Sequence, residues 1–86
     1  MHYVYILTSI KDPSRIYIGR TENLQIRLGE HNRGKSAATK KDAPWKLETY
    51  IAFSEESLAI KFEKYLKAGS GFAFLKKRFL PPLQSK

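Results

Sequence analysis

Short apolar runs separated by turn residues organise the first part of the chain. Residues 3–8 and 15–19 are rich in aromatic and β-branched side chains, a composition that is typical of β-strands. The turn-forming pair Asp12-Pro13 lies between them. The two runs are close enough in the sequence to form an antiparallel hairpin with a rather long loop.

The middle of the chain predicts a helix followed by a third strand. Thr21 can cap this helix, and Gly34 is expected to end it. Leu24 and Leu28 recur four residues apart and give the helix an apolar side. Residues 47–53 then alternate in the manner of a strand. The side chains expected to share one face of this strand are Leu47, Thr49, Ile51 and Phe53.

Two further helices are predicted in the C-terminal part of the chain. Ser54 can cap the first of them, and Gly69 is expected to end it. Its apolar face is expected to contain Leu58, Phe62, Tyr65 and Leu66. A short last helix follows from Ser70 and stops before Pro81, and we expect residues 81–86 to be a loose tail.

The predicted order of elements is strand, strand, helix, strand, helix, helix, or β-β-α-β-α-α. A chain of 86 residues has room for one small core. We therefore expect a single domain over residues 1–80. This order favours an α/β (α+β) fold, in which helices pack on a three-stranded sheet whose first two strands are antiparallel.

The chain is strongly basic, with a formal net charge of +8. Residues 33–46 contain five basic residues and one acidic residue, and residues 61–86 contain seven and one. The intervening residues 47–60 contain three acidic residues and no basic one. This charge favours a polyanionic partner, and we expect nucleic acid, although charge alone does not distinguish DNA, RNA and acidic lipid.

The sequence contains no cysteine and two histidines, His2 and His31. Disulfides and thiolate metal sites are therefore excluded, and a zinc site built from histidines is not expected. The lack of disulfides is compatible with a reducing compartment, and we expect a cytoplasmic protein. The apolar N-terminal run is too short for a signal peptide and no run reaches the length of a membrane span, so no membrane partner is expected.

Two tyrosines are candidates for chemistry because of where the strand pattern places them. Alternate side chains of a strand face opposite ways, so Tyr5 and Tyr17 share the face opposite to the aliphatic residues of the hairpin. Gly19 leaves room beside them. On spacing alone, clustered tyrosines are more often packing residues.

Charged side chains on the predicted helices offer further candidates. Arg27 and His31 lie four residues apart on one helix face, where they could clamp a phosphate and hold a proton acceptor near it. Glu63 is the single acidic residue of the basic C-terminal block and could bind one Mg²⁺. Taken singly, a solvated helix face and an intrahelical ion pair explain these residues as well.

Five separated motifs, taken together and in order, resemble the GIY-YIG nuclease superfamily, and in particular its small stand-alone bacterial members. The resemblance extends from Tyr3 to about Phe79. The motifs are Tyr3-Val4-Tyr5, Tyr17-Ile18-Gly19, Arg20-Thr21-Glu22-Asn23-Leu24, Arg27-x-x-x-His31-Asn32 and Glu63.

The resemblance implies a three-stranded antiparallel sheet flanked by helices and metal-dependent hydrolysis of DNA phosphodiester bonds. It implies that one of the two tyrosines, Tyr5 or Tyr17, acts with His31 as the general base on water. It further implies that Arg27 binds the scissile phosphate and that Glu63 holds a single Mg²⁺ or Mn²⁺ ion. Gly19 is implied to be the structural glycine of the second motif.

The sequence also departs from the family pattern. Tyr3 replaces the glycine of the first motif, and no residue matches a further asparagine found in larger members. We expect an endonuclease directed by DNA structure or damage. The alternative is a non-catalytic module that binds nucleic acid. A homodimer or a partner domain in trans is possible. The residues expected to contact nucleic acid are Arg20, Asn32, Arg33, Lys35, Lys40, Lys41, Lys76, Lys77 and Arg78.

Overall fold

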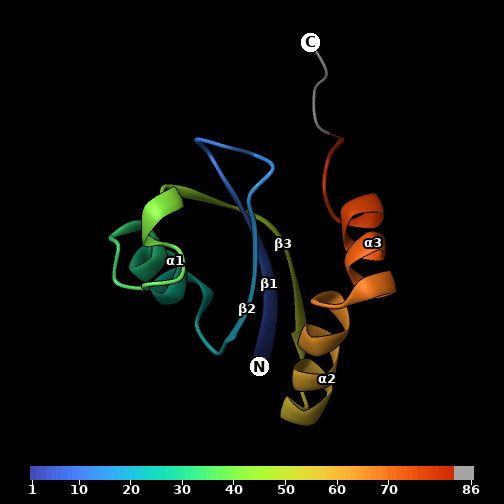
Figure 1. Cartoon of the computed structure of the whole chain (residues 1–86). Coiled ribbons are helices and arrows are strands. Elements are labelled where there is room, and N and C mark those ends of the chain that lie inside the picture. Colours follow the sequence, from blue (N-terminus) through green and yellow to red (C-terminus); the bar gives the residue numbers. More distant parts are fainter. Residues whose placement is uncertain (83–86) are drawn as a thin grey trace.

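The three predicted strands form one antiparallel sheet in the computed structural model, which describes residues 1–82 (Figure 1). Strands β1 (His2–Ser9) and β2 (Ile16–Thr21) form the predicted hairpin. Strand β3 (Trp45–Phe53) pairs antiparallel with the other side of β1, so β1 is central and β2 is an edge strand. The predicted fold class is confirmed.

Helices cover both faces of this sheet. Helix α1 (Leu24–Asn32) lies on one face, whereas α2 (Glu56–Leu66) and α3 (Gly69–Arg78) lie on the other (Figure 1). A single 3-10 turn, Lys40–Asp42, interrupts the long connection between α1 and β3. Within residues 1–82, no helix is long and apolar enough to cross a membrane.

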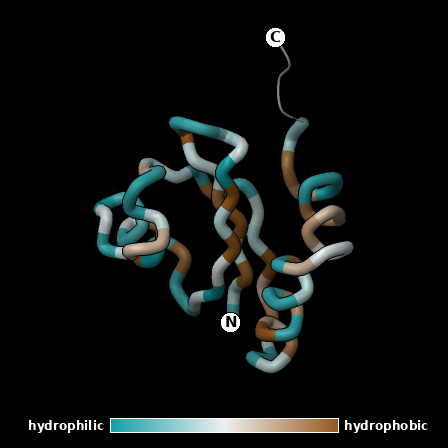
Figure 2. The backbone as a smooth tube through the Cα atoms, in the orientation of Figure 1, coloured by the Kyte–Doolittle hydropathy of each residue, from teal (hydrophilic) through white to brown (hydrophobic). Residues whose placement is uncertain are grey.

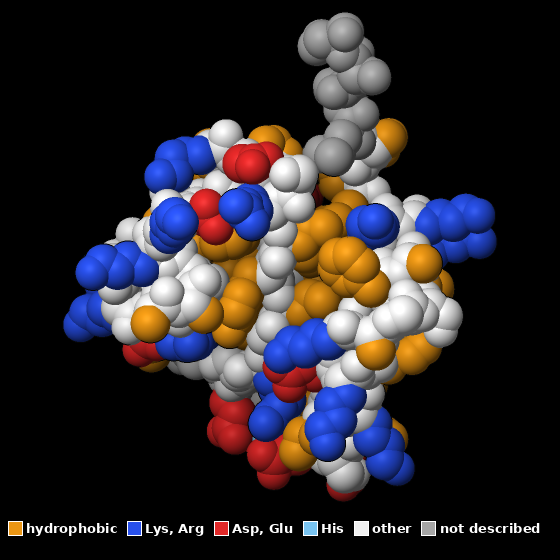
Figure 3. Space-filling view, in the orientation of Figure 1, with side chains coloured by type: hydrophobic (Ala, Val, Ile, Leu, Met, Phe, Trp, Pro, Cys, Tyr) orange, Lys and Arg blue, Asp and Glu red, His pale blue; other side chains and the backbone are white. Residues whose placement is uncertain are grey.

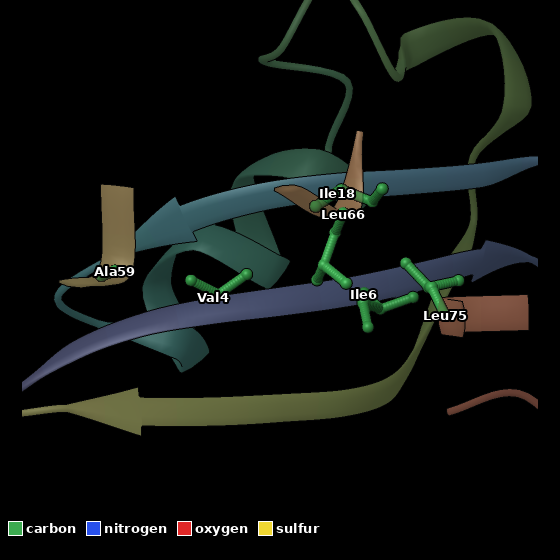
Figure 4. Close-up of a cluster of buried hydrophobic side chains, with 6 residues drawn as sticks. All are labelled: Val4, Ile6, Ile18, Ala59, Leu66 and Leu75. Atoms are coloured by element: carbon green, nitrogen blue, oxygen red, sulfur yellow. The ribbon is translucent and has the colours of Figure 1, made fainter. Parts of the chain in front are cut away.

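The main hydrophobic core lies between the sheet and the pair α2 and α3. Val4 and Ile6 of β1 and Ile18 of β2 point towards these helices (Figure 4). Figure 2 shows hydrophobic residues along the central strands and at intervals in α2. Burial of each such valine or isoleucine side chain stabilises the folded state by about 1.5–3 kcal/mol. The helical residues that meet the strands are Ala59, Leu66 and Leu75.

A second, smaller core lies on the opposite face, beneath α1. It is centred on Tyr5, Leu7 and Trp45, all buried. Leu24 and Leu28 of α1 pack against it, as their helical spacing predicted. The side-chain alternation of β1 therefore separates an aliphatic face from a face that carries tyrosine.

The predicted single alternation of the third strand is wrong. Ile6 pairs with Thr49, but the next residue, Leu7, pairs with Leu47, so Glu48 is an extra residue in β3. This β-bulge reverses which side chains face each helix layer. Leu47 consequently packs in the smaller core, whereas Thr49 donates a hydrogen bond to the carbonyl oxygen of Phe79, at 2.8 Å, on the other face.

The helix starts also differ from the predictions. Asn23, not Thr21, caps α1, because its Oδ1 accepts a hydrogen bond from the backbone N–H of Ile26 at 3.0 Å. The Thr21 hydroxyl instead accepts from the backbone N–H of Asn23, which turns the chain into the helix. Helix α2 begins after Glu55 rather than Ser54, and the Glu55 side chain makes no capping hydrogen bond.

The predicted end of α1 agrees with the structure, whereas α2 ends earlier than predicted. Helix α1 ends at Asn32, and Gly34 follows with a φ of 75°, a left-handed conformation that favours glycine. Helix α2 ends at Leu66, three residues before the predicted Gly69, and Gly69 itself, with a φ of 33°, is the first residue of α3. Most of the predicted tail, residues 83–86, lies outside the described residues.

Candidate active site

The two candidate tyrosines meet on the α1 face of the hairpin. Tyr5 pairs with Gly19 across the two strands, and the ring centroids of Tyr5 and Tyr17 lie 6.2 Å apart. A Cβ atom at Gly19 would overlap the Tyr5 hydroxyl. Glycine is therefore required at this position, because the phenol lies directly over the backbone of β2.

His31 is brought beneath these rings by the last turn of α1. Its side chain is fully buried, and Nε2 lies 2.8 Å from the Tyr5 hydroxyl. The His31 ring also meets the Tyr17 ring at a centroid distance of 4.9 Å, edge to face. Tyr17 is only partly buried, so it is the phenol of this cluster that reaches solvent.

The electrostatics of this cluster keep both Tyr5 and His31 neutral. Burial raises the pKa of Tyr5 to about 12, and the Arg27 guanidinium opposes part of that rise. Burial lowers the pKa of His31, and the positive charge of Arg27 lowers it further. At neutral pH the proton therefore resides on the Tyr5 oxygen.

Arg27 lies one helical turn before His31, as the spacing predicted. Its side chain is 33% exposed, and Nη1 donates a hydrogen bond to Glu30 Oε1 at 2.8 Å. This bond to Glu30 raises the pKa of Arg27. Arg27 thus remains a cation at the rim of the cluster, and an anion that displaces Glu30 could bind to it.

Glu63 enters from the helix layer on the other face. Its Oε1 lies 3.4 Å from Arg20 Nε on the edge strand β2, and its Oε2 lies 2.9 Å from Lys67 Nζ. Burial is the main cause of the raised pKa of Tyr5, and the negative charge of Glu63 adds only a minor part of that rise. The structure brings Tyr5, Tyr17, Arg27 and His31 together; that Glu63 lines the same groove stays a prediction.

The donor chemistry at Glu63 fits a hard divalent cation. Within residues 1–82, no three acidic or histidine side chains cluster as a metal site. Mg²⁺ commonly retains several waters and needs only one or two carboxylates. Glu63 is 18% exposed and provides two oxygens, although a cation would have to displace Arg20 or Lys67 from one of them.

The predicted nucleic-acid contacts fall into two exposed basic groups. Arg33, Lys35, Lys40 and Lys41 are exposed on the connection between α1 and β3. The other group is exposed near the end of α3 and consists of Lys76, Lys77 and Arg78. Figure 3 shows Lys and Arg side chains around the rim of one molecular face, with hydrophobic side chains in its middle.

Arg20 and Asn32 have structural partners in addition to their predicted nucleic-acid contacts. Arg20 forms ion pairs with Glu56 and Glu63 of α2. The Asn32 amide holds the first residue of β3 through both backbone groups: its Nδ2 donates to the Trp45 carbonyl at 3.1 Å, and its Oδ1 accepts from the Trp45 N–H. Their contacts with nucleic acid stay predictions.

Sequence reasoning missed Thr39. It lies in the basic connection, fully buried, and its hydroxyl oxygen is 2.6 Å from His31 Nδ1. No periodic pattern marks this residue, because it precedes a 3-10 turn and lies in neither a strand nor a long helix. The position of Thr39 beside His31 becomes apparent only in the structure, where the connection between α1 and β3 folds back under α1.

Comparison with known proteins identifies the family. The family model described as the GIY-YIG catalytic domain matches residues 1–77. The chain belongs to the GIY-YIG family. A UPF0213 protein of Bacillus licheniformis is 42% identical over 67 residues, which cover 77% of this chain and 67% of that protein. The solution NMR structure of a UPF0213 protein from Bacillus halodurans has a TM-score of 0.56 at 26% identity and covers 93% of this chain and 87% of that one.

Longer GIY-YIG relatives include fungal nucleases. The structure-specific endonuclease subunit slx1 of Talaromyces marneffei is 38% identical over 65 residues, which cover 69% of this chain. The match spans only 17% of that protein. The match of the family model to residues 1–77 confirms the resemblance to the GIY-YIG family over nearly the whole described chain.

Proposed function

We propose that this GIY-YIG protein is a divalent-metal-dependent endonuclease that hydrolyses DNA phosphodiester bonds. The observation that carries the proposal is the buried Tyr5–His31 pair, with Tyr17 and Arg27 at its solvent side. Phosphodiester hydrolysis needs a proton acceptor for water and a cation for the phosphate, and this cluster contains both.

Tyr5 and His31 act as a two-residue base in this mechanism. A pKa of about 12 leaves Tyr5 protonated at neutral pH. Tyr5 can therefore take a proton from water only as its own proton passes to His31 Nε2, 2.8 Å away. Tyr17, half-buried beside His31, would orient that water.

Charge on the phosphate is the second requirement. Arg27 would exchange its bond with Glu30 for one with a phosphate oxygen and so stabilise the transition state. Glu63 is the residue that would hold Mg²⁺ or Mn²⁺, and a divalent ion there supplies charge neutralisation at the leaving oxygen. Arg20, which pairs with Glu63, would orient that carboxylate.

The substrate we propose is DNA with a branch, nick or damaged site. The two basic groups would contact backbone phosphates, which carry no sequence information. The fungal relatives are named structure-specific endonuclease subunits, in agreement with recognition of shape. That name also supports a partner in trans, which mass measurement with and without DNA would detect.

Cleavage assays of three variants test this function. With Mg²⁺ or Mn²⁺ and a panel of branched, nicked and linear DNA, Tyr17→Phe and Glu63→Gln should abolish cleavage but retain binding. Glu56→Gln is the matched control, because Glu56 lies on the same helix and pairs with the same Arg20 at 3.3 Å. Full activity of Tyr17→Phe or Glu63→Gln in a nuclease-free preparation would contradict the assigned roles.

A non-catalytic module that binds DNA or RNA is the second candidate. The observation that favours it is the pairing of both Glu63 oxygens with cations, Arg20 and Lys67. This candidate predicts salt-dependent binding without cleavage of any substrate in the same panel, with either metal. Cleavage by the wild type that is lost in Glu63→Gln excludes it.

A further inference from the structure

Behind the Tyr5–His31 pair lies a third buried polar side chain, Thr39. Its hydroxyl oxygen lies 2.6 Å from His31 Nδ1, on the far side of the ring from Tyr5. We propose that Thr39 is a positioning residue that holds His31 in the tautomer with the proton on Nδ1. Nε2 then remains free to accept the proton of Tyr5. The effect on catalysis rests on the proposed function, whereas the tautomer of His31 is independent of it.

The Tyr5 hydroxyl needs an acceptor for its proton. A buried phenol must donate that proton, because an unsatisfied buried donor is costly. Arg27 approaches the Tyr5 oxygen, but a guanidinium has donors only. Within residues 1–82, the hydrogen-bond partner of the Tyr5 hydroxyl that is able to accept its proton is His31 Nε2, at 2.8 Å. That nitrogen must therefore be unprotonated.

The Thr39 hydroxyl supports the same tautomer of His31 from the Nδ1 side of the imidazole ring. A threonine hydroxyl has one proton, and the carbonyl oxygen of Ser36, 3.5 Å from the Thr39 hydroxyl oxygen, can accept it. Its oxygen is then free to accept from His31 Nδ1–H at 2.6 Å. Hydrogen-bond donation therefore runs from Tyr5 to His31 to Thr39 to Ser36.

The backbone around Thr39 keeps this hydroxyl in place. The indole Nε1 of Trp45 donates to the Thr39 carbonyl oxygen at 2.8 Å, and the Thr39 N–H donates to Ser36 at 3.1 Å. Trp45 is itself held by the Asn32 amide. Thr39 is thus tied to the start of β3 through Trp45 and to the end of α1 through His31.

Nitrogen-15 NMR of the histidine rings tests the tautomer without any assay of activity. The chain has two histidines, so His2→Gln leaves the signals of His31 alone. We expect a protonated Nδ1 and an unprotonated Nε2 at neutral pH in this background. A protonated Nε2 would overturn the proposal, and this measurement needs no change at Thr39.

Two substitutions then test whether Thr39 is the cause. Thr39→Val keeps the shape but removes the acceptor at Nδ1, so the tautomer with the proton on Nε2 should become populated beside the one that Tyr5 favours. Thr39→Ser should keep the wild-type pattern. Thr49→Val is the matched control, since Thr49 bonds a carbonyl oxygen on the opposite face of the sheet. An unchanged His31 tautomer in folded Thr39→Val would overturn the role of Thr39.

The catalytic consequence has a separate readout. Thr39→Val should lower the rate of DNA cleavage about 10- to 100-fold, by analogy with residues that orient metal-ligating histidines. Thr39→Ser should restore the rate, and the binding of DNA should be unchanged in both variants. If the wild type never cleaves DNA, the proposed function is contradicted. If Thr39→Val shifts the tautomer of His31 but cleaves DNA at the wild-type rate, only the proton transfer from Tyr5 to His31 is contradicted.

Discussion

The Tyr5 hydroxyl and His31 Nε2 lie 2.8 Å apart in a site where both side chains are buried. The bond joins the central strand to the end of α1, across 26 residues of sequence. Because neither group has water to replace its partner, breaking this bond leaves a costly unsatisfied polar atom. One contact therefore contributes to both the fold and the proposed chemistry.

The burial of His31 predicts that stability falls in mild acid. The pKa of His31 is lowered in the folded state, so the unfolded chain binds the proton more tightly. Neutral His31 contributes its full stabilisation above the pKa of the unfolded state, about 6.5. This stabilisation is lost as the pH falls through the lower pKa of the folded state. Urea unfolding should therefore give a lower free energy at pH 5.5 than at pH 7.5.

Two histidine variants provide the check on this pH dependence. His31→Gln should be less stable at both pH values but should show a weaker loss between them. His2→Gln should retain the wild-type loss, because His2 lies outside the buried cluster. Equal pH dependence in wild type and His31→Gln would assign the effect to other groups.

Gly19 is expected to tolerate no side chain. A Cβ atom there overlaps the Tyr5 hydroxyl and ring, so Gly19→Ala must displace Tyr5 or open the hairpin. Overpacking of this kind costs about 1–3 kcal/mol in unfolding free energy. Gly29→Ala is the control, since its nearest neighbour is the flexible Arg33 side chain at 3.0 Å and alanine favours the helix. A wild-type unfolding midpoint for Gly19→Ala would contradict the packing described.

Asn32 is expected to stabilise the fold. Asn32→Ala removes two hydrogen bonds and leaves both backbone groups of Trp45 without partners. We expect a loss of about 1–3 kcal/mol in the unfolding free energy measured with urea. Gln25→Ala, at an exposed position of the same helix, should have little effect. Unchanged stability with weakened DNA binding would instead support a role in nucleic-acid contact alone.

The basic connection before β3 is expected to determine the salt dependence of DNA binding. The double variant Lys40→Ala/Lys41→Ala should weaken binding to all DNA sequences alike. The slope of log K against log salt should become shallower by about 0.9 for each phosphate that the protein no longer neutralises. Lys61→Ala/Lys64→Ala removes the same charge from exposed positions of α2 and should change the slope less. Equal effects of both variants would indicate that net charge alone governs binding.

The strand that carries the bulge illustrates a limit of sequence periodicity. Residues 47–53 alternate without interruption, and nothing in them marks Glu48 as the extra residue. The bulge arises because β3 must pair with β1 while Leu47 and Trp45 reach the smaller core. The caps differ for a similar reason, since Thr21 and Asn23 are both suitable and local geometry selects between them.

The sequence by itself determined the strands, the helices and the face that carries Tyr5 and Tyr17, because these follow from the two-residue and 3.6-residue periods of neighbouring side chains. It also placed Arg27 and His31 on one helix face. Only the tertiary structure decided the burial of His31, its bond to Tyr5, and Thr39 behind it. These contacts join residues distant in the sequence, so hydrogen-bond geometry and desolvation, which no local pattern encodes, determine them.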